Sequence, residues 1–386
     1  MSDSDADKAF GKRGNRDASV VNPRPGGTVD GTRKSGPTRP GREGDPFLIG
    51  EGMTGVDFIA LNTDEQDLLD CDAPTKLDIG QSTTRGLGAG ADPAVGERAA
   101  RDNSQDIEDV LTGADMVFVT AGEGGGTGTG GAPIVAGIAR GLGALTVAVV
   151  TKPFSFEGKR RADNAEHGIE KLRDACDTLI TIPNDRLLQQ EDKTISINEA
   201  FSKADEVLFN GVQGITDLIS TPGLINVDFA DVKSVLADSG AALMGIGRAS
   251  GNDRASKATD AAINSPLLEY SMEGAKGVLL SIAGGSDLGL FEANEAASIV
   301  REKAHPDANI IFGTVIDDSL GDEVRVTVVA AGFEGGEPPA RVFENETDAS
   351  EEDIEEVAEK SSAMSIRQRT TRVSDEDDID IPPFMR

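Results

Sequence analysis

Cysteine is scarce in this chain of 386 residues, which contains only Cys71 and Cys176. Two cysteines are too few for a disulfide framework or a structural zinc site. Long apolar runs are also missing, because the longest, around Ala144 to Val150, falls far short of the about 20 residues that cross a bilayer. The first residues lack the pattern of a secretory signal peptide. These absences together predict a protein of the reducing cytoplasm.

Basic residues are outnumbered, with 37 Lys and Arg against 68 Asp and Glu and a formal net charge of -31. Such a charge repels a phosphate backbone, so nucleic acid is a poor partner. A mean hydropathy of -0.27 and 38% hydrophobic residues are typical of a globular protein with disordered appendages. At about 150 residues per domain, the length predicts two domains.

Short apolar runs alternate with amphipathic stretches from residue 56 onward, which predicts an α/β fold with a Rossmann-like parallel sheet covered on both faces. The predicted strands of this first region are Val56–Leu61, Met116–Val119, Leu145–Val150 and Leu179–Ile182. The predicted helices between them are Gln105–Leu111, Ala132–Leu142 and Glu166–Cys176.

A long central helix is predicted over residues 196–221, because apolar residues recur there at spacings of three and four. Ser196 and Glu199 have the spacing of a capping box, and Pro222-Gly223 is a stop signal. A second, smaller α/β domain follows to residue 333. Its predicted strands are Ala241–Ile246, Gly277–Ile282, Asn309–Val315 and Val324–Ala330.

Glycine gathers at one place, in "DMVFVTAGEGGGTGTGGAPIVAGIAR", where an apolar strand runs through seven glycines into a helix. Glycine lets the backbone turn sharply and bring its N–H groups close to an anion, and the helix N-terminus adds partial positive charge. The natural ligand of such a loop is a di- or triphosphate. The alternative is a flexible surface loop.

Two common nucleotide motifs do not fit this loop. Gly126, Gly128 and Gly131 match the dinucleotide fingerprint by letter, but the next strand ends in Thr151-Lys152 rather than in an acidic residue. A P-loop is excluded because no lysine follows the glycines.

With its neighbours, the loop resembles the signature of the tubulin/FtsZ family, and of its bacterial members in particular. The resemblance continues through "NTDEQDLL", "RGLGAGADPAVGERAA", "TKPFSFEGKRRADNAEHGI", "IPNDRLL", "TPGLINVDFADVKSVL" and the terminal "DIPPFMR". It implies a self-polymerising GTPase that forms the cytokinetic ring at midcell. The implied division is a disordered segment 1–46, a GTP-binding domain 47–195, the central helix 196–221, a C-terminal domain 222–333, an acidic linker 334–374 and a partner-binding peptide 375–386.

The resemblance also implies which residues bind GTP and GDP, with Mg²⁺ held mainly by the nucleotide phosphates and no protein metal ligand. The implied phosphate-side residues are Asn62, Asp64, Gly88, Ala89, Gly90, Ala91, Gly124, Gly125, Gly126, Thr127, Gly128, Thr129 and Gly130. The implied ribose, phosphate and base contacts are Glu157, Arg161, Asn184, Phe201 and Asp205.

Simpler interpretations of some of these residues stay open. The Asn-Thr-Asp at residues 62–64 is also typical of a turn that caps a helix. "GKRRAD" could be a solvated basic patch, and Phe201 could pack in the core. A carboxylate at Asp205 suits guanine, because it accepts from the base's N1–H and 2-amino groups, whereas adenine presents an acceptor at N1.

Catalysis by resemblance falls to Asn226, Asp228 and Asp231, in a loop that would enter the nucleotide pocket of the neighbouring subunit. The alternative for both aspartates is a favourable place at a helix N-terminus. The terminal peptide, with Asp378, Ile379, Ile381, Pro382 and Phe384, is expected to dock into membrane-tethering and regulatory divisome proteins. Its alternative is a frayed terminus.

One departure from the family pattern stands at the start. Family members open with a strand and a first glycine loop, whereas residues 1–46 here show neither, and Pro23, Pro25, Pro37 and Pro40 make a regular element unexpected. Two hypotheses account for this: a shifted upstream reading frame, or a paralogue with impaired GTP binding. The second makes a non-catalytic polymer component or regulator the alternative function.

Overall fold

The computed structural model describes residues 56–188, 195–221, 223–268 and 270–333, together with the backbone of residues 18–23. The chain divides into two compact units, Met1–Arg341 and Val342–Arg386. The second unit, and with it the predicted terminal peptide, lies outside the described residues. Within the described part, no helix combines the length and apolarity needed to span a membrane.

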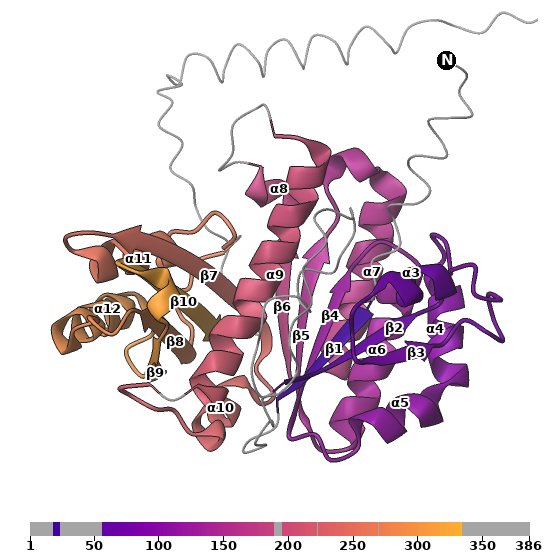
Figure 1. Cartoon of the computed structure of the whole chain (residues 1–386), viewed down its shortest axis with the longest axis horizontal. Helices are drawn as coiled ribbons and strands as arrows, with labels where there is room; N and C mark the ends of the chain where they lie inside the picture. Colours follow the sequence, from indigo (N-terminus) through magenta and orange to yellow (C-terminus); the bar gives the residue numbers. More distant parts are fainter. Residues whose placement is uncertain (1–17, 24–55, 189–194, 222, 269, 334–386) are drawn as a thin grey trace, which may run out of the picture. The chain divides into compact units, whose positions relative to one another are not determined.

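Figure 1 shows the strands of the first unit. As hydrogen-bonded neighbours they follow the order β3-β2-β1-β4-β5-β6-β7-β10-β8-β9 across the sheet. The pairs β2–β3, β4–β5, β5–β6 and β6–β7 are parallel, which confirms the predicted α/β fold with a mainly parallel central sheet. The elements of the first region are β2 (Val56–Asn62), α3 (Glu65–Asp70), β3 (Thr75–Asp78), α4 (Pro93–Asp102), α5 (Ser104–Leu111), β4 (Met116–Gly122), α6 (Thr127–Gly141), β5 (Leu145–Lys152), η1 (Ser155–Glu157), α7 (Lys159–Ala175), β6 (Thr178–Pro183) and α8 (Asn184–Leu187).

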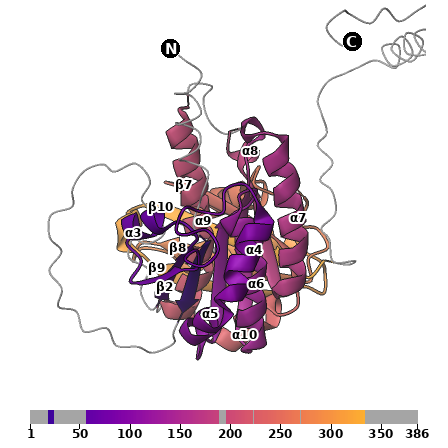
Figure 2. The same cartoon turned by 90° about the vertical axis from the view of Figure 1, so that its right-hand side faces the viewer.

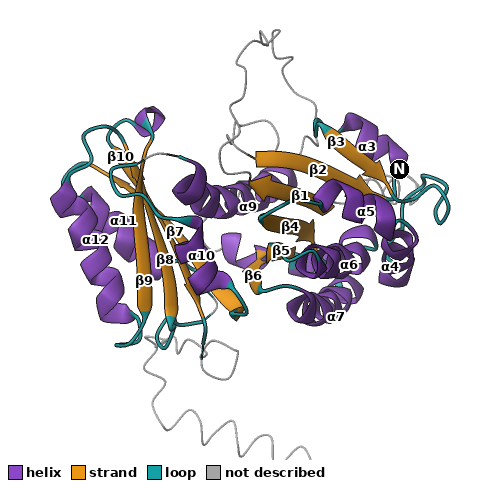
Figure 3. Cartoon of the chain, turned by 90° about the horizontal axis from the view of Figure 1, so that it is seen from below, coloured by secondary structure: helices purple, strands orange, loops and turns teal. Residues whose placement is uncertain are grey.

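Both faces of this sheet are buried, because side chains along a strand alternate between its two sides. On β4, Met116 and Phe118 belong to the core that also contains residues of α9 (Ile197–Ser220), while Val117 and Val119 belong to the core with residues of α6. Figures 2 and 3 show α4, α5, α6 and α7 along one face and α9 on the other. This two-sided burial explains the near-continuous apolar runs of the strands.

The predicted central helix is α9, whose N-terminus carries the expected capping box of Ser196 and Glu199. It leads into the second region, where β10 pairs antiparallel with β7 and β8, and β8 pairs parallel with β9. The elements there are α10 (Phe229–Leu236), β7 (Gly240–Ser250), α11 (Arg254–Ile263), β8 (Gly277–Gly284), α12 (Leu290–Lys303), β9 (Asn309–Ile316), η2 (Asp318–Leu320) and β10 (Glu323–Ala331).

The N-terminal segment differs from the sequence prediction, which expected no regular element before residue 46. The structure places a strand, β1 (Ala18–Pro23), between β2 and β4. It is antiparallel to both neighbours, with Val20 opposite Ile59 on one side and Val119 on the other. In this position the backbone of β1 supplies hydrogen-bond partners to both β2 and β4.

Candidate functional site

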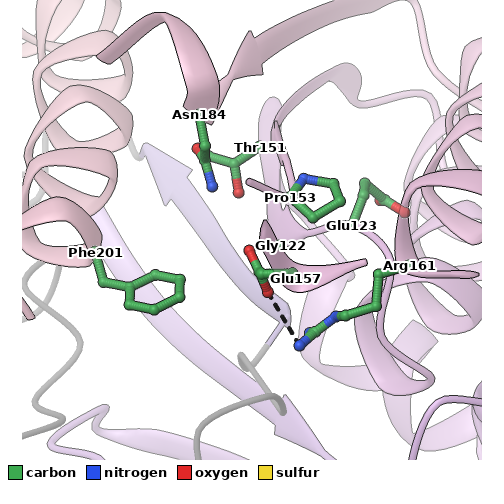
Figure 4. A pocket seen from close by; sticks show the side chains of 8 residues that line it. All are labelled: Gly122, Glu123, Thr151, Pro153, Glu157, Arg161, Asn184 and Phe201. Carbon is green, nitrogen blue, oxygen red and sulfur yellow. Dashed lines mark ion pairs between the residues drawn. The ribbon is translucent and has the colours of Figure 1, made fainter. Parts of the chain in front are cut away.

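A pocket lies where β4, β5 and β6 end, at the carboxyl edge at which parallel sheets bind ligands. Figure 4 shows the side chains that line it. They are Gly122, Glu123, Thr151, Pro153, Glu157, Arg161, Asn184 and Phe201. Four residues that the resemblance implied, Glu157, Arg161, Asn184 and Phe201, therefore come together from η1, α7, α8 and α9.

The glycine loop passes close to other backbone segments, which explains why several of its positions are glycine. Gly124 has φ +100°, and a Cβ there would lie 2.8 Å from the Arg161 carbonyl oxygen. The Gly126 N–H donates to the Gly90 carbonyl (2.9 Å), so the glycine loop is tied to the predicted loop 88–91. Gly126 precedes α6 without a side-chain cap, so the partial positive charge of this helix start is directed at the loop.

Thr63 connects three loops and was not singled out from the sequence. Its hydroxyl lies 2.5 Å from the Thr127 hydroxyl and accepts from the Ala89 N–H (2.9 Å). Its carbonyl accepts from the Gly88 N–H (3.0 Å). Thr63 is fully buried, so it holds the loop after β2, the loop 88–91 and the start of α6 in one fixed arrangement.

The neighbours of Thr63 are engaged in local structure. The Asn62 side-chain oxygen accepts from the backbone N–H of Thr63 (2.7 Å) and of Asp64 (3.1 Å). Asp64 is the N-cap of α3 and accepts from the Gln66 N–H (2.9 Å). The capping interpretation of this turn is therefore confirmed, and a nucleotide contact of Asn62 or Asp64 stays a prediction.

Glu157 and Arg161 form an ion pair of 3.0 Å inside the pocket. Glu157 also accepts from the Phe154 N–H (2.9 Å), which fixes its carboxylate. The side chains are 11% and 26% exposed, respectively. Arg161 is therefore part of a structured pocket wall rather than of a solvated basic patch, whereas its neighbours Lys159 and Arg160 are exposed.

Phe201 projects from the first turns of α9 into an aromatic cluster. It makes edge-on contacts with Phe154 (5.3 Å between ring centres) and Phe156 (6.3 Å). Asp205 follows one helical turn later and is half-buried, on the side of α9 that carries Phe201. Asn184, at the start of α8, is buried at 3% exposure, and its side-chain oxygen has no hydrogen-bond partner within the described residues. A planar apolar surface beside an unused amide oxygen suits a purine base.

Glu123 is a second residue that the sequence did not single out. It lies inside the glycine loop at 3% exposure, and neither carboxyl oxygen forms a hydrogen bond of normal geometry within the described residues, although the Thr129 hydroxyl lies close to the carboxyl group. Burial raises the pKa of this carboxyl from 4.5 to about 8, and the nearby Thr129 hydroxyl acts in the opposite direction. At neutral pH the side chain is therefore mainly the uncharged acid.

The three predicted catalytic residues do not belong to this pocket. Asp228 and Asp231 are exposed at the start of α10, and the Asn226 side chain accepts from the Gly223 N–H (2.8 Å). Figure 1 shows α8 and α10 at opposite ends of α9. At 1.5 Å per residue, the helix from Phe201 to Ser220 alone spans about 28 Å. The acidic segment (Asn226, Asp228 and Asp231) therefore cannot reach the pocket of its own chain.

Among the described residues, no group of three or more His, Cys, Asp or Glu side chains is placed so that it could hold a metal ion. In nucleotide sites Mg²⁺ commonly takes ligands from substrate phosphates and water. That arrangement of Mg²⁺ stays a prediction.

Comparison with known families identifies both regions of the chain. The profile of the "Tubulin/FtsZ family, GTPase domain" matches residues 50–192, and that of the "FtsZ family, C-terminal domain" matches residues 240–334. Together these matches span all elements from β2 to β10 except α9 and α10.

Solved structures agree with the family profiles. An FtsZ dimer of M. jannaschii, described as empty, is 44% identical with a TM-score of 0.71, over 76% of this chain and 87% of that chain. A point mutant of FtsZ from the same organism is 47% identical with a TM-score of 0.70, over 72% and 83%. The CetZ2 protein of Haloferax volcanii, a GTPgS-bound protofilament, shares the fold at 21% identity and a TM-score of 0.61, over 81% and 90%.

Proposed function

Because the chain belongs to the tubulin/FtsZ family, we propose that it binds GTP, stacks head to tail into filaments and hydrolyses GTP where two subunits meet. The members of this family are GTPases. The solved FtsZ dimer supports self-association. The observation that carries the proposal is the position of the pocket and of the acidic segment at opposite ends of α9.

This position has a direct geometric consequence. A residue about 28 Å away along a helix cannot orient water in the pocket of its own chain. In a head-to-tail row, however, the α10 end of one subunit faces the pocket end of the next. Such heterologous contacts form open filaments rather than closed dimers. The shared site is therefore complete only in the assembled state.

The chain's own residues then divide the work of hydrolysis. The glycine loop and the start of α6 hold the phosphates by backbone N–H groups and the helix dipole. Asp228 and Asp231 of the next subunit polarise the attacking water, and Asn226 orients it. These carboxylates and the polyphosphate repel each other, and Mg²⁺ held by the phosphates would supply the positive charge that offsets this repulsion.

Selection of guanine falls to the base end of the pocket. Phe201 offers a ring face, Asn184 a buried amide, and Asp205 a carboxylate that accepts from the N1–H and 2-amino groups of guanine. Adenine leaves this carboxylate opposite an acceptor, which costs affinity. The same pocket therefore favours GTP over ATP.

In the cell, this function corresponds to a cytoplasmic polymer at the midcell division ring. The acidic linker and the peptide 375–386 would connect the filament to membrane-tethering and regulatory partners, since Ile379, Ile381 and Phe384 can serve as apolar anchors. Both lie outside the described residues, so this role rests on the sequence resemblance.

A specific observation favours a second candidate, a filament component without turnover. Because β1 is antiparallel, its last residue Pro23 lies opposite Val56, at the sheet edge away from the glycine loop. The chain that follows β1 thus leaves from the wrong edge to form a phosphate loop beside Gly124–Gly130. Weak phosphate binding would leave the chain able to join filaments without hydrolysing GTP.

The rate of GTP turnover as a function of protein concentration separates the two candidates. We expect phosphate release per chain to be negligible at concentrations where sedimentation detects no polymer, and to rise steeply once polymer appears. Turnover that is constant per chain from dilute to assembled samples contradicts the shared site. Polymer without any phosphate release supports the second candidate instead.

A further inference from the structure

Glu123 lines the pocket of the proposed nucleotide site, but the proposed function gives this residue no role. The residue interrupts the run of glycines between β4 and α6, and its backbone N–H donates to the Thr151 carbonyl (2.9 Å), which fixes its position at the pocket wall. Its carboxyl group lies between two helices: a Cβ added to Gly168 of α7 would come within 2.6 Å of Glu123 Oε2 and 2.4 Å of Thr129 Cγ2. The carboxyl group is thus enclosed, and small residues leave room for it.

Among the described residues, no cation acts on the pKa of Glu123. Arg161 is paired with Glu157 of η1, and Lys152 at the end of β5 is paired with Glu166 of α7. The neutral side chain of Thr129 on α6 lies close to Glu123, and Asn184 on α8 and Phe201 on α9 line the same pocket. His167, next to Gly168 on α7, is exposed and contacts the Asp163 carbonyl.

A bound polyphosphate would add several negative charges directly beside this buried group, because it occupies the same loop. Like charges at short range in a poorly solvated site repel strongly, so phosphates and an ionised carboxylate disfavour each other there. The uncharged acid has no such conflict, and its O–H can donate a hydrogen bond to an oxygen.

We propose that Glu123 makes nucleotide binding proton-linked: the pocket takes the polyphosphate with Glu123 as the neutral acid, and ionisation of Glu123 weakens binding. This inference rests on the proposed binding of GTP. It adds a residue of this chain that regulates the affinity for any nucleoside di- or triphosphate, whatever the base.

The sign of the pH dependence follows from linkage. The free pocket loses the Glu123 proton near pH 8, and bound phosphates raise the pKa of the carboxyl further, so binding takes up a proton above this pH. Affinity for nucleotide should be flat below about pH 7 and fall as pH rises. The terminal phosphate itself ionises near pH 6 and so is almost fully charged from about pH 7 upward, where the effect of Glu123 is expected.

The test is GTP and GDP affinity of the full chain between pH 6 and 9.5, compared with Glu123→Gln and a control, Glu170→Gln. Glu170 is exposed on α7, so this control removes a carboxylate without touching the pocket. We expect the wild-type and control affinities to fall about tenfold between pH 7 and 9, and the affinity of Glu123→Gln to change far less. Any ionisation of the nucleotide is common to all three chains.

Calorimetry in two buffers of different ionisation enthalpy gives a second readout that needs no variant. At pH 8 the wild type should take up on the order of half a proton per nucleotide bound. Equal pH profiles for wild type and Glu123→Gln, or binding without proton uptake, overturn the role of Glu123 while leaving GTP binding intact. Absence of binding at every pH overturns the proposed function and this inference with it.

Discussion

A carboxyl group that is buried without a partner destabilises the folded chain whenever it ionises. For Glu123, the folded pKa of about 8 exceeds the ordinary value of 4.5, so the folded state holds a proton that the unfolded state has already released. The free energy of unfolding therefore falls as pH rises from 4.5 to 8, by a total on the order of 5 kcal/mol, and is unaffected beyond either limit.

Glu123→Gln removes this dependence at the scale of one residue. Between pH 6 and pH 8.5 the wild type should lose on the order of 3 kcal/mol of unfolding free energy relative to the variant. Urea unfolding at the two pH values measures the difference, with Glu170→Gln as the control that should follow the wild type. A variant that tracks the wild type at both pH values would show that Glu123 is solvated.

Individual site residues could be predicted where they belong to a recognisable sequence motif. The glycine loop stood out by its pattern, whereas Glu157, Arg161, Asn184 and Phe201 were expected from the family resemblance, and the structure brings these four side chains to one pocket. Thr63 and Glu123 were missed because nothing in a sequence reports burial at a loop. A polar residue inside a run of glycines is the only signal that Glu123 offered.

At the scale of elements, β1 is the piece that makes the central sheet continuous. It pairs with β2 over six residues and with β4 over three. Proline lacks the N–H that a strand with two neighbours must donate. We expect Val20→Pro to lower the unfolding free energy by about 1–3 kcal/mol, because a backbone group of the neighbouring strand loses its hydrogen-bond partner, whereas Val20→Ile, which keeps the N–H, should have little effect.

Denaturant unfolding of both variants provides the measurement. If Val20→Pro unfolds at the same denaturant concentration as Val20→Ile, the strand does not contribute to the sheet, and β2 and β4 must find other partners.

Strands and helices with strong periodicity were predictable as elements, and the alternation that implied a parallel sheet is confirmed by β2, β4, β5 and β6. The strand β1 was not predictable, because its segment has no periodic pattern of apolar residues. Its extended backbone is defined by pairing with β2 and β4, which are distant in sequence. The short β3 and the helix α4 were missed for a related reason: their residues are small or polar, and α4 is held by close packing of Gly96 against the Gly126 carbonyl.

The whole molecule carries a net charge of -31, which affects any assembly of identical copies. Stacked subunits repel one another over distances set by the Debye length, about 10 Å at 0.1 M salt and about 3 Å at 1 M. We therefore expect the lowest protein concentration that yields sedimentable polymer with GTP to fall as KCl rises from 0.05 to 0.5 M. Sucrose at matched osmolarity is the control, and a threshold that rises with KCl would show that attraction between charges drives assembly.

The proposal that a second subunit completes the site comes from the family resemblance. Charge and spacing alone left Asp228 and Asp231 equally compatible with a simple helix start, and they do lie at the start of α10. The length of α9 excludes their action within one chain, and this became visible only once the pocket was located at its other end.

The most direct measurement of the shared site is GTP turnover by a mixture of two inactive variants. Asp231→Ala leaves the pocket intact but removes the carboxylate that the chain would contribute to the pocket of the neighbouring subunit. Gly126→Val disrupts the glycine loop, because even a Cβ at this position would lie 2.6 Å from the Gly90 carbonyl oxygen. Each variant alone should release almost no phosphate. Mixed at assembling concentrations, they should release phosphate well above the sum of the two, because intact pockets then meet intact acidic segments. A mixture no more active than its parts would contradict hydrolysis between subunits.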